Sequence, residues 1–140
     1  AHGVIWHLFN GGASVTIANR TLEKAEQLAA EFAGYGTVFA KRYEALAGKQ
    51  FDMVINATSG GLSDELPPLP EGVFKPGALA YDMMYGKETP FMKYSRERGA
   101  ARISDGLGML VEQAAEAFRI WRGVRPIPAV SLKSCAAANE

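Results

Sequence analysis

The sequence has a single cysteine, no excess of charge of either sign and no long apolar run. Cys135 lies in the terminal stretch SLKSCAAANE, so an internal disulfide and a zinc site built from several cysteines are excluded. Fifteen Lys and Arg balance fifteen Asp and Glu, which removes any overall attraction to nucleic acid or to an anionic membrane. The start AHGVIWHLFNGG is too short to span a bilayer and lacks a basic leader. We expect a cytoplasmic protein with neither nucleic acid nor membrane as a partner.

Several catalytic patterns are also missing. No cluster of metal-ligating residues and no Ser-His-acid set can be identified, so we expect no metal. His2 and His7 fall on a predicted helix, where surface or packing roles are the better interpretation. The stretch NGGAS follows that helix and lacks the G-x-G-x-x-G spacing, so we do not interpret it as a phosphate loop.

What is present is a chain of 140 residues, the length of one ordinary domain, with 48% hydrophobic and 21% charged residues. Apolar periodicity and Gly/Pro punctuation predict an alternation of helices and strands. Residues 124–140 could hold one more short helix or a loose tail. Helices are predicted at residues 1–10, 21–32, 42–48, 89–99 and 107–123, and strands at 14–19, 37–41, 51–58, 78–85 and 101–104.

Strands that alternate with helices predict an α/β fold with a doubly wound, mainly parallel sheet. The stretch FDMVINAT is nearly continuous in apolar residues, which is typical of a strand buried on both faces of such a sheet. The first predicted helix begins at residue 1 without an N-cap, so we expect the chain to be a fragment of something longer.

The stretch VTIANRTLEKAEQLAAEF places a cation at a strand-to-helix corner. In a dinucleotide fold, an acidic residue after the second strand binds the ribose of NAD, whereas an arginine accommodates the 2′-phosphate of NADP. Arg20 stands at that kind of position, Asn19 and Thr21 flank it, and Lys24 lies one helical turn further on. Pattern alone leaves an alternative equally open, in which Thr21 is an ordinary N-cap and both cations are simply solvated.

Two other residues have a structural and a functional interpretation. Gln113 shares a predicted helix face with apolar residues, and a lone buried amide most often bonds a backbone group in the core. Tyr85 is most often a half-buried ring with a solvated hydroxyl.

Four stretches, NRTLEKA, FDMVINATSGG, YDMMYGKETPF and DGLGMLVEQAAEAF, occur in the order and at the distances seen in the C-terminal half of shikimate dehydrogenase. The chain resembles that family over residues 1 to about 130. The resemblance implies a Rossmann-like fold that binds NADP and serves the reversible reduction of 3-dehydroshikimate to shikimate in aromatic amino acid biosynthesis. It also leaves a homodimer of the full-length protein as a possibility.

The resemblance assigns a role to each matching position. The corner at residues 19–21 and the basic residue after it would clasp the 2′-phosphate of NADP, and residues 57–59 would lie along the cofactor. Met83, the backbone at Gly106 and the region of Met109 would contact the nicotinamide. The implied cofactor contacts are Asn19, Arg20, Thr21, Lys24, Ala57, Thr58, Ser59, Met83, Gly106 and Met109, and the implied shikimate contacts are Tyr85 and Gln113.

The sequence also departs from the family. The Gly-rich diphosphate loop, the first strand and the N-terminal substrate domain have no counterpart, so the family's catalytic Lys and Asp are not in this chain. The missing strand is central in the order 3-2-1-4-5-6, and we expect its two neighbours to lose a ladder partner. The chain alone is therefore predicted to be poorly stable or inactive. A quinate-accepting relative and a non-catalytic nucleotide-binding remnant remain alternatives.

Overall fold

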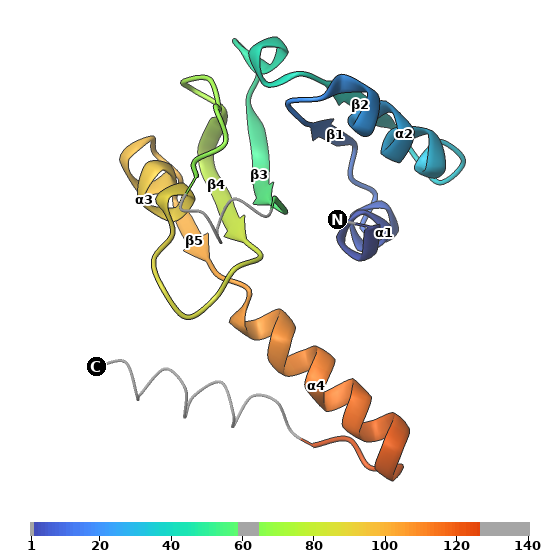
Figure 1. The fold of residues 1–140 in the computed structure, drawn as a ribbon. Coiled ribbons are helices and arrows are strands. Elements are labelled where there is room, and N and C mark those ends of the chain that lie inside the picture. Colours follow the sequence, from blue (N-terminus) through green and yellow to red (C-terminus); the bar gives the residue numbers. More distant parts are fainter. Residues whose placement is uncertain (1, 59–64, 127–140) are drawn as a thin grey trace.

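The computed structural model describes residues 2–58 and 65–126. Within these described residues, ten elements follow one another in an alternation close to the predicted one (Figure 1). The predicted segment 42–48 forms a single 3-10 turn rather than an α-helix. The elements are α1 (His2–Asn10), β1 (Val15–Ala18), α2 (Leu22–Phe32), β2 (Val38–Lys41), η1 (Tyr43–Leu46), β3 (Phe51–Asn56), β4 (Phe74–Asp82), α3 (Pro90–Glu97), β5 (Arg102–Ser104) and α4 (Leu107–Arg122).

The described strands form two parallel sheets rather than one. β1 pairs with β2, and β3, β4 and β5 form a second sheet in that order. The two sheets stand apart with the inner strands β1 and β3 nearest to each other (Figure 1). The α/β fold with parallel strands is confirmed, and so is the expectation that two inner strands lack a ladder partner between them. Their backbone groups on the inner edges have no partner strand within the described part of the chain.

Helices α1 and α2 pack against the first sheet. α2 contacts both β1 and β2, and its Ala25 and Phe32 are buried. Aromatic rings join α1 to the end of α2, since the Trp6 ring meets the Tyr35 ring edge-on at 4.9 Å between centroids. These contacts hold the predicted Asn19–Thr21 corner between a strand and a helix that are packed together.

The strand predicted at 78–85 is shifted in the structure. β4 begins at Phe74 and ends at Asp82, so Tyr85 lies beyond it. Between the pairs Phe51–Phe74 and Met53–Leu79, one residue of β3 is matched by four of β4, which is a bulge that contains Pro76 and Gly77. Proline and glycine normally argue against a strand, and the bulge is where a sheet tolerates them.

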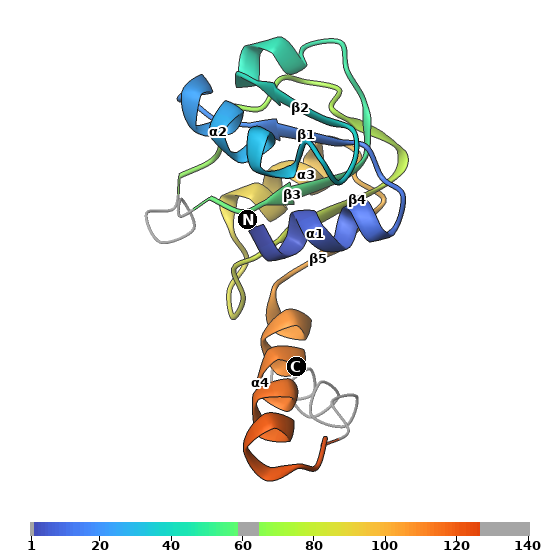
Figure 2. The same cartoon turned by 90° about the vertical axis from the view of Figure 1, so that its right-hand side faces the viewer.

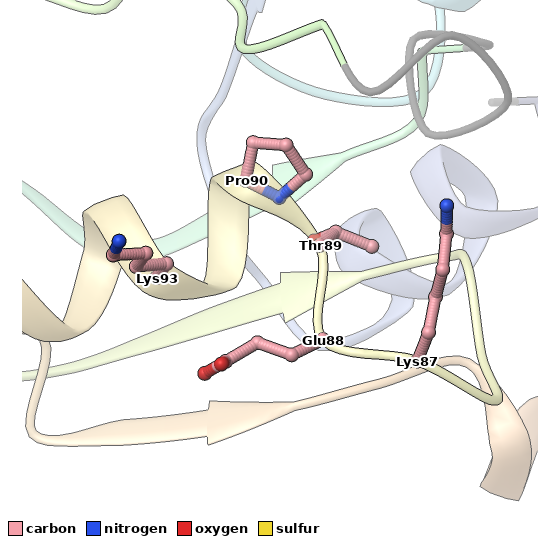
Figure 3. A pocket seen from close by; sticks show the side chains of 5 residues that line it. All are labelled: Lys87, Glu88, Thr89, Pro90 and Lys93. Atoms are coloured by element: carbon pink, nitrogen blue, oxygen red, sulfur yellow. The ribbon is translucent and has the colours of Figure 1, made fainter.

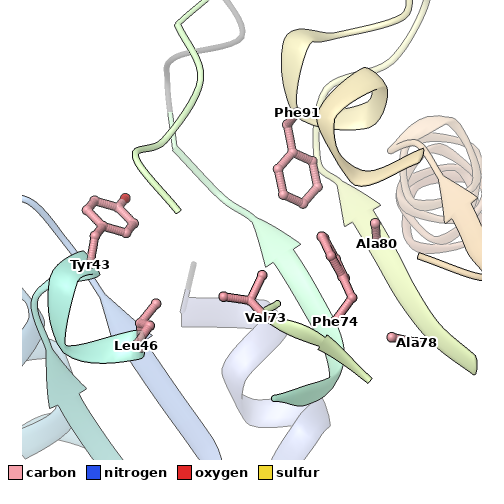
Figure 4. Close-up of a cluster of buried hydrophobic side chains, with 7 residues drawn as sticks. All are labelled: Tyr43, Leu46, Val73, Phe74, Ala78, Ala80 and Phe91. Carbon is pink, nitrogen blue, oxygen red and sulfur yellow. The ribbon is translucent and has the colours of Figure 1, made fainter. Parts of the chain in front are cut away.

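One cluster of buried apolar side chains spans the molecule from η1 to α3 (Figure 4). It does not bury β3 on both faces, as the sequence predicted, because Asp52 is exposed and Met53 is 43% exposed. β3 is an edge strand of its sheet, which leaves its side chains open toward β1. The buried members of the cluster are Tyr43, Leu46, Val73, Phe74, Ala78, Ala80 and Phe91.

The last helix, α4, projects away from both sheets (Figures 1 and 2). It ends at Gly123, whose φ of 73° is the left-handed conformation that commonly closes a helix. Its far end is largely uncovered, with Ile120 67% and Trp121 81% exposed. No helix among residues 2–58 and 65–126 is long and apolar enough to cross a membrane. The predicted tail falls mostly at 127–140, outside the described residues.

Candidate functional site

The corner between β1 and α2 is organised by Asn19. Its side-chain oxygen Oδ1 accepts a hydrogen bond from the backbone N–H of Thr21 at 3.1 Å, which is an Asx turn. Thr21 occupies the N-cap position, but its own side chain makes no capping hydrogen bond. The alternative in which Thr21 is the N-cap is therefore confirmed in position, but the Thr21 side chain makes no capping hydrogen bond and Asn19 supplies the local one.

Arg20 extends from this corner into solvent. Its side chain is 63% exposed and lies 3.5 Å from the Glu65 carboxylate, itself 58% exposed. Exposed pairs of this kind contribute little to stability, so the guanidinium can exchange its partner for another anion. Burial raises the pKa of the neighbouring Tyr43 phenol, and the positive charge of Arg20 acts in the opposite direction.

The carboxyl ends of β3, β4 and β5 form a second wall. The backbone N–H of Met83 donates to the Asn56 carbonyl at 3.1 Å, and the N–H of Gly106 donates to the Met84 carbonyl at 2.9 Å. These two bonds bring three strand ends to one edge, as parallel pairing requires. Met83 and Gly106, predicted to lie near the nicotinamide, are thus neighbours across that edge.

Side-chain hydrogen bonds shape the turn after β3. The side-chain oxygen of Asn56 accepts from both the N–H and the hydroxyl of Thr58, at 3.2 and 2.7 Å. Ala57 and Thr58 are exposed at the strand end. Ser59, the third residue predicted to lie along the cofactor, falls outside the described residues.

A cleft of about 830 Å³ lies between the two sheets, and its lining runs from the β1–α2 corner to the end of β3. Asn19, Arg20 and Lys24 line one side of it, and Ala57 and Thr58 line the other. The structure therefore brings together five of the predicted cofactor contacts. Apolar side chains of α1, β1 and β3 line much of the rest, among them Val4, Ile5, Leu8, Val15, Ile17, Val54 and Ile55.

A smaller hollow of about 370 Å³ opens at the start of α3 (Figure 3). It is lined by Lys87, Glu88, Thr89, Pro90 and Lys93. Glu88, which precedes α3, forms an ion pair with Arg96 within that helix. The hollow is wide open to solvent, and it lies beside the turn that carries Tyr85.

The two predicted substrate contacts are both open to solvent. Tyr85 is 47% exposed on the turn after β4, as the structural interpretation of a half-buried ring expected. Gln113 is exposed on α4, so the expectation of a buried core amide is wrong. The reason is that α4 projects from the sheets, which leaves Leu110 37% exposed on the same helix. Met109, one turn before Gln113, is partly buried.

The sequence interpretation missed Asp82, the residue of β4 at the strand end. Asp82 is fully buried and faces Asn56, its register partner on β3, with a 3.2 Å hydrogen bond between their side chains. An aspartate at the end of an otherwise apolar strand was a visible signal for it. Among the described residues, no group of three or more His, Cys, Asp or Glu could hold a metal ion.

Two family models match the chain. Residues 1–63 match the model described as shikimate / quinate 5-dehydrogenase, and residues 106–130 match the shikimate 5′-dehydrogenase C-terminal domain. A shikimate dehydrogenase (NADP(+)) of Methylobacillus flagellatus is 57% identical over 99% of this chain and 52% of its own length. The chain thus spans about half the length of the curated relatives it matches.

Solved structures agree with the sequence relatives. An Ael1 enzyme from Pseudomonas putida is 51% identical, with a TM-score of 0.77 over 86% of this chain and 45% of that protein. The shikimate 5-dehydrogenase of Thermus thermophilus, in complex with NADP(H) and shikimate, is 31% identical, with a TM-score of 0.69 over 87% of this chain and 45% of that protein. On these matches and on its parallel α/β architecture, the chain belongs to the shikimate dehydrogenase family.

Proposed function

We propose that this chain is the NADP-binding part of a shikimate dehydrogenase, which reversibly reduces 3-dehydroshikimate to shikimate with NADPH. The observation that carries the proposal is the shared cleft, where Arg20 and Lys24 on one wall face Ala57 and Thr58 on the other. Two cations beside the N-terminus of α2 suit a doubly charged phosphate group. No carboxylate occupies the position where a protein that prefers NAD would carry one.

The residues present fit a dinucleotide phosphate on chemical grounds. The Arg20 guanidinium is solvent-facing and lies near the exposed Glu65 carboxylate, a weak pairing that leaves it available for a bidentate contact. The Asn19 turn fixes the corner from which Arg20 projects. In the proposed complex, these groups select the extra phosphate of NADP, which NAD lacks.

The second wall has the proposed role of positioning. When bound, the nicotinamide supplies the hydride chemistry, and the protein supplies orientation. The Met83 and Gly106 backbone would bound the nicotinamide end, and the Tyr85 phenol and Gln113 amide would offer neutral hydrogen-bonding groups to shikimate. By the family resemblance, the catalytic Lys and Asp belong to a segment outside this chain.

The test uses a hybrid protein, in which residues 1–140 replace the matched segment of the M. flagellatus relative. We expect the hybrid to form NADPH from NADP and shikimate, and to do so more efficiently than with NAD or with quinate. Turnover with quinate and NAD as the preferred pair would support the quinate-accepting alternative instead. A folded hybrid that binds neither NADP nor shikimate by titration calorimetry would support the non-catalytic remnant.

The chain alone is the companion sample. We expect it to show no turnover, because no residue in it is proposed as the catalytic acid or base. A cooperative melt together with NADPH-dependent shikimate formation by the chain alone would contradict this. A cytoplasmic setting, favoured by the single cysteine, and a homodimer of the full-length protein stay predictions, and sedimentation velocity of the hybrid tests the dimer.

A further inference from the structure

Asp82 is a buried junction at the carboxyl end of β4. Its Oδ2 accepts hydrogen bonds from the Asn56 amide at 3.2 Å and from the Thr89 hydroxyl at 2.6 Å. Its Oδ1 accepts from the backbone N–H of Met84 at 3.0 Å. The side chain has no exposed surface, and both side-chain partners are buried as well. A carboxylate buried this deeply is costly unless its oxygens are satisfied, and here each oxygen has a donor.

The three donors belong to three different segments of the predicted site. Asn56 ends β3 and holds the Thr58 turn on its own side-chain oxygen. Met84 sits in the turn between Met83 and Tyr85. Thr89 is the N-cap of α3 (Figure 3). Its hydroxyl also accepts from the N–H of Met92. This carboxylate ties the predicted cofactor side, the predicted nicotinamide turn and the helix behind Tyr85 to one point.

We propose that Asp82 is a positioning residue, which fixes the Met83–Tyr85 turn relative to the Thr58 turn and thereby aligns nicotinamide and substrate. This inference rests on the proposed function. Asp82 touches neither ligand in this assignment, since it has no exposed surface. It acts through Met84, Asn56 and Thr89. All three groups donate, so only an oxygen pair that accepts on both atoms serves them together.

Asp82→Asn is the direct test, because it keeps the shape of the side chain and replaces one accepting oxygen with a donor. The new amide group must face either the Met84 N–H or the two side-chain donors, so one arm of the junction is lost. Asp52→Asn is the matched control. Asp52 lies at the opposite end of β3, is exposed, and contacts Lys75 rather than the strand-end edge.

Thr89 provides a second, independent pair of variants. Thr89→Val removes the hydroxyl that bonds Asp82 and caps α3, while nearly keeping the volume. Thr89→Ser retains the hydroxyl and loses one methyl group. If position is what the junction provides, the serine variant keeps the wild-type kinetics and the valine variant resembles Asp82→Asn.

The variants are made in the hybrid protein, with kinetics, thermal unfolding and methionine-methyl NMR as readouts. We expect Asp82→Asn and Thr89→Val to lower kcat by about 10-fold to 100-fold, because small misplacements of bound reactants have effects of that size. The KM for NADP should change by less than about threefold, since the Arg20 corner does not contact Asp82. The methyl signals of Met83 and Met84 should shift in Asp82→Asn even without ligand. The methyl signal of Met92, on α3, is compared between Thr89→Val and Thr89→Ser.

Three results would overturn the inference. The first is a kcat within about twofold of the parent for folded Asp82→Asn, and the second is unchanged Met83 and Met84 signals. The third is a loss in Thr89→Ser as large as in Thr89→Val. A parent hybrid without turnover would instead contradict the proposed function, and the methyl signals would still decide whether Asp82 holds the turn.

Discussion

Gly106 lies against the backbone of Met83, so closely that a Cβ on Gly106 would be 2.1 Å from the Met83 carbonyl oxygen. Real Cβ atoms do not approach an oxygen so closely. The contact is between two backbones, and Gly106 also donates its N–H to the next carbonyl, that of Met84. The start of α4 therefore packs directly on the turn after β4, and only glycine fits at position 106.

Gly106→Ala should destabilise the chain because the added methyl group meets backbone rather than a flexible side chain. We expect a loss of about 1–3 kcal/mol in the free energy of unfolding, as for other overpacked sites. Its φ of −78° is open to alanine, so the loss would be steric. Urea unfolding of the parent and variant hybrids measures it.

Gly108→Ala is the matched control for that experiment. Gly108 lies two residues later, in the first turn of α4, and nothing lies within 4 Å of its added Cβ. Alanine is the better helix former, so this variant should be neutral or more stable by up to about 1 kcal/mol. Equal destabilisation by both substitutions would show that the Met83 contact is not the cause.

Arg20→Gln should reduce the preference for NADP over NAD. Hydrogen bonds to charged groups are worth about 1.5–3 kcal/mol, so the ratio of the two dissociation constants should fall roughly 10-fold to 100-fold. Affinity for NAD should change little, since it lacks the phosphate. Titration calorimetry of the hybrid with both nucleotides tests this.

Two further variants control for charge. Arg96→Gln removes a cation on α3 that pairs with Glu88, and it should leave the nucleotide preference unchanged. Glu65→Gln removes the carboxylate beside Arg20 and should strengthen NADP binding slightly. An unchanged preference in Arg20→Gln would show that the corner at Asn19–Thr21 does not select the phosphate.

The inner edges of β1 and β3 should exchange their amide hydrogens quickly in the chain alone. Among residues 2–58 and 65–126, neither strand has a ladder partner on the side that faces the cleft, so some of their N–H groups depend on solvent. In the hybrid we expect β1 and β3 to gain more protection than Leu79–Tyr81 of β4, which are already paired on both sides. Equal gains in all three strands would indicate only a general rise in stability. Hydrogen exchange followed by mass spectrometry distinguishes the two.

Asp52 should titrate at unusually low pH. The hydrogen bond from the Lys75 ammonium to its Oδ2, at 2.9 Å, holds the pKa of this carboxyl below its ordinary value. A depressed pKa in the folded state stabilises the fold above the ordinary Asp value of about 3.9, and the benefit disappears as the pH falls through the lower folded value. Carboxyl ¹³C shifts of the hybrid give the pKa. Lys75→Met should return it toward the ordinary value, and an unchanged shift there would exclude the ion pair as the cause.

Local sequence pattern predicted most elements because apolar period and turn chemistry agree along the chain. The β1–α2 unit is an example, since a β-branched run and a single apolar helix stripe leave little choice. The start of β4 could not be predicted in this way. Pro76 and Gly77 argue against a strand locally, and only the pairing of Phe74 with Phe51 shows that a bulge absorbs them.

The sequence predicted only some residues of the candidate site. Arg20 and Thr58 carry chemistry that a motif can reveal, and both line the cleft. The role proposed for Asp82 depends on its hydrogen bonds to three partners, some in its own turn and one distant in sequence. A periodic sequence pattern does not encode such bonds. Gln113 shows the opposite error, because an apolar helix face predicts burial only if something covers it, and α4 projects from the sheets.

The separation of the two sheets also determines how this chain responds to ligands. Arg20 and Thr58 stand on opposite walls, and no strand ladder among the described residues fixes the span between them. A molecule that contacts both walls connects the two sheets, and its binding stabilises the folded form in which the sheets face each other by mass action. The melting temperature of the chain should then rise with the concentration of a bridging nucleotide.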